Sequence, residues 1–204
     1  YRQRILKIIV LGNASVGKTS LMTQYVNRKF SIQYKATIGA DFMSTEAVID
    51  DDRITLHIWD TAGQERFQSL GASFYRGADA CVLVYDITSA RSLTSLDVWR
   101  DEFLVHTGGK EETFPFIVIG NKCDKEEERT VEKERAELWC KSKRGKPIEH
   151  FECSAKTGQN VHEAFLHVTK LALEQDTSDA QEVFIPEHID VDHDTKPDQG
   201  GCGC

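Results

Sequence analysis

The residues with the clearest chemical potential are positions 12–19, which read GNASVGKT. They match the pattern G-x-x-x-x-G-K-[ST], in which a glycine-bearing turn directs backbone N–H groups towards phosphate oxygens. Lys18 is placed to reach the outer phosphates of a nucleotide, and the Thr19 hydroxyl is placed to bind Mg²⁺. The segment therefore predicts a phosphate site formed by Gly12, Asn13, Ala14, Ser15, Val16, Gly17, Lys18, Thr19 and Ser20.

The surrounding sequence supplies the structure that such a site needs. An apolar run at residues 5–11 predicts a buried strand. After the loop, Leu21, Met22 and Tyr25 recur at helical spacing. A helix that begins at the loop adds the positive end of its dipole to the N–H groups. This context favours a phosphate site over the alternative, an ordinary turn that contains two glycines.

A second group of polar residues follows the predicted strand at 54–59. Asp60 closes that strand, so its carboxylate would hold Mg²⁺, directly or through water. Gly63 allows its backbone N–H to approach a terminal phosphate closely. Gln64 is not a general base at neutral pH, so it would orient a water molecule for in-line attack. The alternative is an exposed polar loop without a chemical role.

Residues after two further predicted strands could recognise a base. The carboxylate of Asp124 can accept two N–H bonds from guanine, whereas adenine offers no such pair of donors. Asn121 and Lys122 would brace the loops around the base, and the backbone N–H of Ala155 could bond the guanine carbonyl. Together these positions predict a guanine site formed by Phe30, Asn121, Lys122, Asp124, Ser154, Ala155 and Lys156.

The elements that must position these residues alternate between strands and helices. The sequence predicts strands at residues 5–11, 41–49, 54–59, 80–86, 115–120 and 148–153, helices at 18–28, 91–106, 131–143 and 160–174, and a helical turn within 66–76. Continuous apolar runs are typical of parallel strands buried on both faces, whereas 41–49 alternates and leads into a hairpin at the sheet edge. We expect an α/β fold of the P-loop NTPase type, with an open sheet of six strands, mostly parallel with one antiparallel edge strand, and helices on both faces. Ligands then bind at the carboxyl ends of the strands, where every motif above falls.

The composition limits the class of protein. The 204 residues, of which 40% are hydrophobic and 28% charged, can form one core of ordinary size. The net charge of −8 disfavours a nucleic-acid surface. No apolar stretch approaches the ~20 residues that span a bilayer. The six cysteines are not expected to form disulfides, because a nucleotide-binding protein of this type works in the reducing cytosol.

The composition changes near Gln175. Residues 176–204 contain eight acidic side chains and one lysine, so they carry −7 of the total charge. We therefore expect two parts, a GTP-binding domain at residues 1–174 and a disordered acidic tail at residues 175–204. A docked strand near Val183–Ile185 is the alternative for part of the tail.

These motifs together resemble those of the Ras superfamily of small GTPases over residues 4–174. Within that superfamily the chain is similar to the Rab family. At Ala14 it departs from the commoner Rab pattern of Gly or Ser, and this difference could slow hydrolysis. Rab-type segments lie at residues 38–42, 59–67 and 74–79, and segments similar to the late-endosomal branch of the family lie at 67–71, 99–103 and 114–116.

The resemblance implies roles for further residues. Thr37 would join Thr19 and Asp60 on Mg²⁺ and contact the γ-phosphate, and Tyr34 would contact the nucleotide. Residues 61–76 would form the segment called switch II, which responds to the γ-phosphate. An effector-binding surface would consist of Ile38, Phe42, Trp59 and Phe74. Core packing is the alternative for the three aromatic residues, above all for Trp59.

The chain ends in Cys202-Gly203-Cys204. This ending resembles the site of double geranylgeranylation in Rab proteins. Two lipid chains give a stable membrane anchor, which one chain does not. The lipids would have to offset repulsion between the acidic tail and an anionic leaflet. A metal site formed by these cysteines with His188 or His193 is the alternative.

The resemblance implies a switch that binds GTP or GDP with Mg²⁺, hydrolyses GTP slowly through Gln64 and Lys18, and recruits effectors to control vesicle trafficking. The implied partners are a guanine nucleotide exchange factor, a GTPase-activating protein (GAP), a GDP-dissociation inhibitor, a Rab escort protein and effectors; the protein itself would be a monomer. The implied location is the cytoplasmic face of late endosomes, lysosomes, phagosomes or vacuoles, with a cytosolic pool. Alternatives are a Rab of another endocytic compartment, a nuclear-transport GTPase without lipid, and an ATPase or phosphotransferase.

Overall fold

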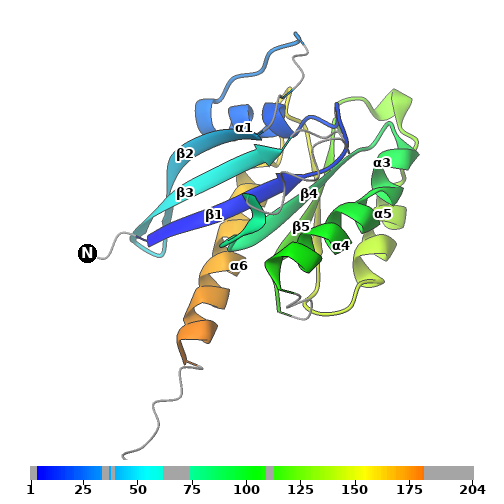
Figure 1. Cartoon of the computed structure of the whole chain (residues 1–204). Coiled ribbons are helices and arrows are strands. Elements are labelled where there is room, and N and C mark those ends of the chain that lie inside the picture. The colour runs from blue at the N-terminus through cyan, green and yellow to red at the C-terminus, as the bar shows by residue number, and fades with distance from the viewer. Residues whose placement is uncertain (1–3, 34–36, 38–39, 62–73, 109–112, 182–204) are drawn as a thin grey trace, which may run out of the picture.

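The computed structural model describes residues 4–33, 37, 40–61, 74–108 and 113–181. They form one sheet with helices packed against it (Figure 1). The strands are β1 (Arg4–Leu11), β2 (Ala40–Ile49), β3 (Asp52–Thr61), β4 (Ala80–Asp86), β5 (Phe116–Asn121) and β6 (Glu149–Cys153). The helices are α1 (Lys18–Asn27), α3 (Ala90–Thr94), α4 (Leu96–Thr107), α5 (Lys133–Lys141) and α6 (Val161–Gln181), with a 3₁₀ turn, η2 (Glu126–Glu128).

The sheet has the strand order β2-β3-β1-β4-β5-β6. β2 pairs antiparallel with β3, and all other pairs are parallel, so the expected fold is confirmed. The β2–β3 hairpin turns at Asp50 and Asp51, whose φ angles are 49° and 69°. Two successive left-handed residues match the twist of the flanking strands, and aspartate tolerates this conformation better than most residues.

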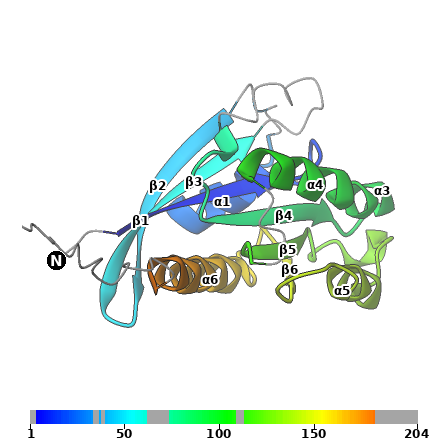
Figure 2. The same cartoon turned by 60° about the horizontal axis from the view of Figure 1, so that its bottom comes forward.

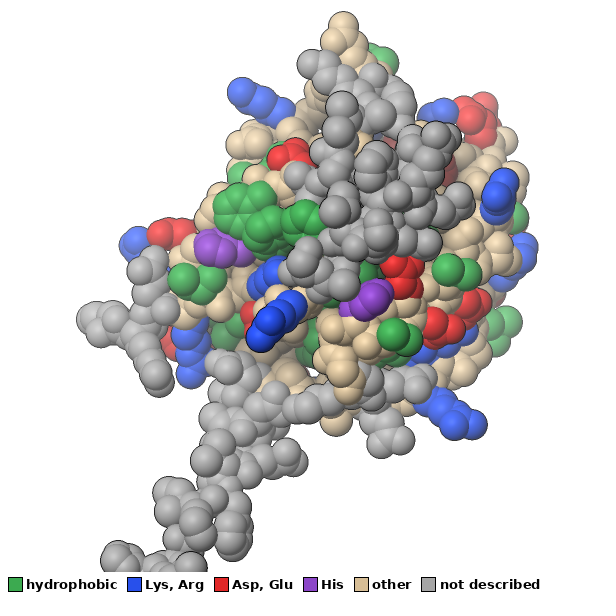
Figure 3. Space-filling view, in the orientation of Figure 1, with side chains coloured by type: hydrophobic (Ala, Val, Ile, Leu, Met, Phe, Trp, Pro, Cys, Tyr) green, Lys and Arg blue, Asp and Glu red, His purple; other side chains and the backbone are tan. Residues whose placement is uncertain are grey.

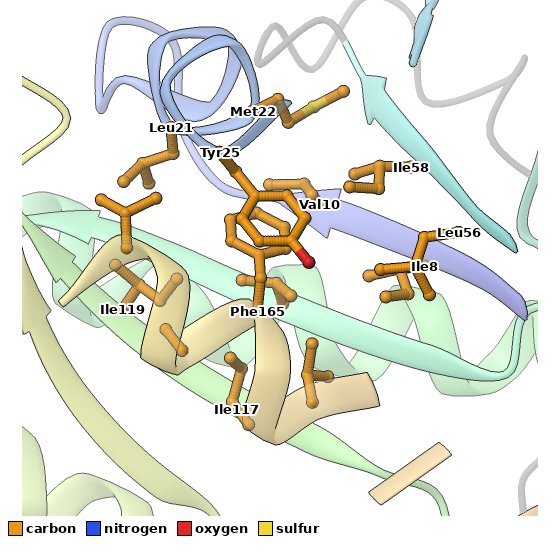
Figure 4. Packing of buried hydrophobic residues seen from close by; sticks show 14 of the residues in the cluster. Ile8, Val10, Leu21, Met22, Tyr25, Leu56, Ile58, Ile117, Ile119 and Phe165 are labelled. Carbon is orange, nitrogen blue, oxygen red and sulfur yellow. The ribbon is translucent and has the colours of Figure 1, made fainter. Parts of the chain in front are cut away.

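Two hydrophobic cores cover the two faces of the sheet. In β1, Ile8 and Val10 pack into the core under α1 and α6, whereas Ile9 and Leu11 pack into the core under α4 and α5. Figure 2 shows α6 and α4 on opposite sides of the sheet. In the first core, side chains of α1 meet Phe165 of α6 above the strands (Figure 4). Burial on both faces explains the continuous apolar runs of the central strands.

The helices differ from the sequence prediction at several boundaries. The helix expected at 91–106 is divided into α3 and α4 at Ser95, whose hydroxyl donates to the Arg91 carbonyl at 2.9 Å. Such a bond within a helix offers the backbone an alternative partner and often bends the helix. α5 is two residues shorter at each end than the predicted 131–143. The turn expected within 66–76 lies mostly outside the described residues.

The end of α6 also differs from the prediction. The helix continues to Gln181 instead of ending at 174. No glycine or proline interrupts residues 175–181, and each further residue adds one backbone hydrogen bond at little cost once a helix is established. The helix therefore extends into the segment expected to be disordered. The strand considered near 183–185 lies outside the described residues. None of the described helices combines the length and the apolar character required to cross a bilayer.

Candidate functional site

A cavity opens beside the P-loop, the segment at residues 12–19. Its volume of about 620 Å³ is within the range of small-ligand sites. Thirteen of the expected nucleotide residues line it: Ala14, Ser15, Gly17, Lys18, Thr19, Ser20, Phe30, Thr37, Asn121, Lys122, Asp124, Ala155 and Lys156. The expected residues Gly12, Asn13, Val16 and Ser154 contact this lining by hydrogen bonds. Tyr34, Gly63 and Gln64 lie outside the described residues.

Two glycines fix the path of the P-loop. Gly12 and Gly17 have φ angles of 147° and 97°, which favour glycine. A Cβ on Gly12 would lie 2.2 Å from the Val84 carbonyl oxygen, and one on Gly17 would lie 2.2 Å from Asn121 Nδ2. The loop can therefore approach its neighbours this closely only because both positions lack a side chain.

Lys18 is folded over the loop from which it projects. Its side chain is buried, and Nζ donates to the carbonyl oxygens of Gly12 at 2.9 Å and Asn13 at 3.1 Å. Burial lowers the pKa of Lys18, while the negative charge of Asp60 acts in the opposite direction. The ammonium group is thus held in one place at the head of the cavity.

Three oxygen-bearing side chains meet beside Lys18. Thr19 Oγ1 donates to Asp60 Oδ2 and lies 2.9 Å from Thr37 Oγ1, which in turn lies 3.3 Å from Asp60 Oδ2. Asp60 is fully buried, and its Oδ1 has no hydrogen-bond partner among the described residues. Burial raises the pKa of Asp60, opposed by the charge of Lys18 and by hydrogen bonds from the two threonines.

This arrangement fits Mg²⁺. Hydroxyl and carboxylate oxygens are the protein ligands that Mg²⁺ prefers, and it commonly takes only one or two carboxylates. A buried carboxylate oxygen without a partner is costly, and a cation would satisfy it. Among the described residues, no group of three or more His, Cys, Asp and Glu side chains offers a different metal site.

Asn121 and Lys122 connect the base-side loops to the P-loop. Asn121 Nδ2 donates to the Val16 carbonyl at 2.8 Å, and Asn121 Oδ1 accepts the N–H of Ala155 at 3.1 Å. Lys122 Nζ donates to the Ser15 carbonyl at 2.9 Å. Both side chains therefore connect these loops to one another. The Ala155 N–H, expected to meet a guanine carbonyl, is bonded to Asn121 in this structure.

Asp124 is held from the next loop. The hydroxyl of the fully buried Ser154 donates to Asp124 Oδ1 at 2.6 Å, while Asp124 itself is exposed at the cavity. The bond fixes the carboxylate and leaves it with further lone pairs that can accept donors. Phe30 contributes a 40% exposed ring to the cavity lining.

The sequence prediction missed supporting residues. Asp86 ends β4 and pairs with Lys122 Nζ at 2.6 Å. Like Asp60, Asp86 is an acidic residue at the carboxyl end of a predicted strand, and this pattern could have identified it. Thr23 lines the cavity one helical turn after Thr19, and helical spacing could have identified it. The contact between Asn13 and Trp99 joins residues 86 positions apart, and no sequence signal points to it.

The three aromatic residues expected to bind effectors form one row. The ring of Trp59 lies 4.9 Å from Phe42 and 5.8 Å from Phe74, measured between centroids. Phe42 is 44% exposed, whereas Trp59 and Phe74 are partly buried against the α4–α5 core. Figure 3 shows hydrophobic side chains gathered over β2 and β3 on this face. The alternative of core packing thus holds in part for Trp59 and Phe74. Ile38 and the terminal cysteines lie outside the described residues.

Comparison with known proteins places the chain in a family. Residues 7–174 match the model of the Ras family. Ras-related protein Rab-7a of Paramecium octaurelia is 54% identical over 205 residues, which cover 98% of each chain. Ras-related protein Rab7 of Pisum sativum is 52% identical over 206 residues, covering 100% of this chain and 98% of the relative.

A third relative agrees with these two. The Ypt/Rab-type GTPase ypt7 of Schizosaccharomyces pombe is 56% identical over 195 residues, which cover 94% of each chain. The matched region contains the P-loop, the strand-end residues and the whole cavity. The resemblance inferred from the motifs is confirmed. The chain belongs to the Ras family as a Rab7-type small GTPase, an enzyme of vesicle trafficking that binds guanine nucleotides and hydrolyses GTP.

Proposed function

We propose that the cavity holds GTP or GDP with Mg²⁺, and that Thr19, Thr37 and Asp60 bind the metal. The observation that carries the proposal is the meeting of these three side chains, from three separate segments, at Asp60 Oδ2, while the buried Asp60 Oδ1 has no hydrogen-bond partner among the described residues. When bound, Mg²⁺ would neutralise negative charge on the phosphates. Thr37 would contact the metal and the γ-phosphate only in the GTP state, which makes its segment a sensor.

We propose the following roles for the catalytic residues. Lys18 supplies a fixed positive charge beside the phosphates, supported by its two carbonyl contacts. Gln64 would position the attacking water, and the N–H of Gly63 would bond the γ-phosphate. The P-loop contains no arginine, so a GAP would supply further positive charge in trans. Intrinsic hydrolysis would be slow for that reason.

The base specificity rests on Asp124. Its carboxylate, held by Ser154, would accept the two adjacent N–H groups of guanine. Competition for binding tests this role: we expect GTP, and not ATP, to displace fluorescent GDP. Asp124→Ala should weaken GDP binding at least tenfold, whereas Glu127→Ala, which changes an exposed carboxylate on the nearby η2 turn, should not. Displacement by ATP as effective as that by GTP would refute the assignment.

The metal assignment has its own test. Thr19→Asn should weaken GTP binding in the presence of Mg²⁺, and the difference between variant and wild type should shrink when EDTA removes the metal. Glu127→Ala, a change at an exposed side chain outside the cavity lining, serves as the control. A Thr19→Asn variant with unchanged Mg²⁺-dependent affinity would exclude Thr19 as a ligand. Gln64→Leu should slow hydrolysis while GTP binding persists.

We further propose that residues 1–174 form the GTP-binding domain and residues 175–204 a tail that carries geranylgeranyl groups on Cys202 and Cys204. The lipids would attach the protein to late endosomal and lysosomal membranes, where the aromatic row meets effectors. An exchange factor, a GAP, an escort protein and a GDP-dissociation inhibitor would regulate this cycle. Mass spectrometry of protein from the membrane fraction tests the modification: finding both cysteines unmodified would contradict it.

A further inference from the structure

The side chain of Asn13 links the P-loop to α4. Trp99 Nε1 donates to Asn13 Oδ1 at 2.8 Å, and Asn13 Nδ2 donates to Ser95 Oγ at 3.1 Å. The Ser95 hydroxyl donates in turn to the Arg91 carbonyl at 2.9 Å. One short side chain in the loop is therefore fixed at both ends of its amide group, by residues more than 80 positions away in the chain.

The chemistry of the partners sets the orientation of this amide. An indole N–H can only donate, so the oxygen of Asn13 must face Trp99. The Ser95 hydroxyl donates its hydrogen to the Arg91 carbonyl, so its oxygen accepts from the NH₂ group of Asn13. Each group has the partner it requires, and a network satisfied in this way is rigid.

The link bears on the residue that meets the phosphates. The backbone carbonyl of Asn13 accepts a hydrogen bond from Lys18 Nζ at 3.1 Å. Trp99 is 5% exposed and belongs to the core under α4 and α5, so it gives the link a fixed base. On its other side the P-loop is braced by Asn121 and Lys122. The loop is thus held from two directions.

We propose that Asn13, Ser95 and Trp99 are positioning residues that hold the P-loop in its phosphate-binding shape and so set the lifetime of the bound nucleotide. The inference rests on the proposed nucleotide site. It adds that residues of α4, outside the cavity, control how fast the nucleotide is released. A loop freed from α4 would sample shapes in which Lys18 and the backbone N–H groups no longer converge on the phosphates.

The test measures release of fluorescent GDP from the preloaded full chain, with excess unlabelled GDP and Mg²⁺. Trp99→Phe retains most of the ring but removes the N–H, and release should accelerate about three- to tenfold, the effect expected of one hydrogen bond. Trp139→Phe is the matched control. Trp139 of α5 also donates through Nε1, at 3.2 Å, but to Asp97 of α4 and not to the P-loop. The control should release GDP at the wild-type rate.

A double-mutant cycle separates positioning from general destabilisation. Asn13→Ala should accelerate release by itself, and Trp99→Phe should then add little, because the link is already broken. Additive effects of the two changes, or a lowered melting temperature with an unchanged rate, would overturn the inference. Ser95→Ala, which should accelerate release about twofold, provides a second variant if Trp99→Phe does not fold.

The outcomes distinguish this inference from the proposed site. If the wild-type chain does not retain fluorescent GDP, the proposed site fails, and the inference fails with it. If the wild type retains GDP and both Trp99→Phe and Ser95→Ala release it at the wild-type rate, the inference alone fails.

Discussion

At the scale of single residues, the site depends on side chains that satisfy backbone groups of neighbouring loops. Asn121 does this for two loops at once, since its amide accepts from Ala155 and donates to Val16. Lys122 does the same for the Ser15 carbonyl, whereas the Ser154 hydroxyl donates to the side-chain carboxylate of Asp124. These residues hold the shape of the cavity whether or not they touch a ligand.

Replacement of Asn121 by Ala should therefore affect both stability and binding. It would leave a buried C=O and a buried N–H without partners, at about 1–3 kcal/mol each. We expect the free energy of unfolding in urea to fall by about 2–6 kcal/mol and the affinity for GDP to fall as well. Gln159→Ala, at an exposed position in the loop after Ser154, is the control. A variant as stable as wild type would show that water replaces the amide.

His150 makes stability depend on pH. Its Nε2 lies 3.0 Å from the Tyr85 hydroxyl, and its Nδ1 is buried without a hydrogen-bond partner among the described residues. Burial lowers the pKa of His150 below its ordinary 6.5, opposed by the charge of Glu152. The unfolded chain then binds the proton more readily, so the stabilising contribution is complete above pH 6.5 and is lost as the pH falls below it.

Melting temperatures measured between pH 8 and pH 5 test this dependence. The wild type should lose more stability over this range than His150→Gln does, because the variant lacks the titrating group. His106→Gln, at an exposed histidine, should follow the wild-type profile. Parallel profiles for wild type and His150→Gln would exclude this role for His150.

At the scale of elements, α1 and α6 are joined by aromatic stacking. The rings of Tyr25 and Phe165 lie 4.5 Å apart with an interplanar angle of 15°. Because α1 begins at Lys18, this contact fixes the helix whose first turn carries the proposed phosphate and metal residues. α4 supports the P-loop, which precedes α1, through the hydrogen bond from Trp99 to Asn13.

Phe165→Ala should reduce the free energy of unfolding by about 3–5 kcal/mol, as for other buried aromatic residues. Denaturation in urea measures the change. Val105→Ala, at a position that is 77% exposed on α4, should change stability by no more than about 0.5 kcal/mol. Equal effects of the two substitutions would contradict the role assigned to the α1–α6 contact.

At the scale of the whole molecule, charge and fold are separated along the chain. Residues 182–204 hold six acidic side chains and one lysine, so their removal changes the net charge from −8 to −3. The described residues before them contain both cores and the cavity. We infer that folding and nucleotide binding need only the first 181 residues.

A chain that ends at Gln181 should keep the melting temperature and GDP affinity of the full chain, and it should lose attachment to membranes in cells. A chain that ends at Lys170 should melt at a lower temperature, because it lacks Ala172, which is buried in the first core. Thermal melting and membrane fractionation measure both properties. Membrane attachment of the chain ending at Gln181 would contradict the proposed lipid anchor.

Much of the fold and of the site could be predicted from the sequence, because their signals are local. The apolar runs indicated the strands, and the polar residues that follow them indicated the P-loop, Asp60, Asn121 and Asp124. The boundaries at Ser95 and Gln181 could not be predicted, since a helix bends or continues through small differences in backbone hydrogen bonding.

The sequence by itself determined which chemical groups stand at the strand ends, because spacing along a strand or helix fixes the face and the end on which a residue lies. Only the tertiary structure decided which of these groups touch. Lys122 pairs with Asp86, and Asn13 bonds to Trp99, across 36 and 86 positions. Such pairs arise from the packing of whole elements against one another. The sequence pattern around each residue does not indicate which distant residue it will contact.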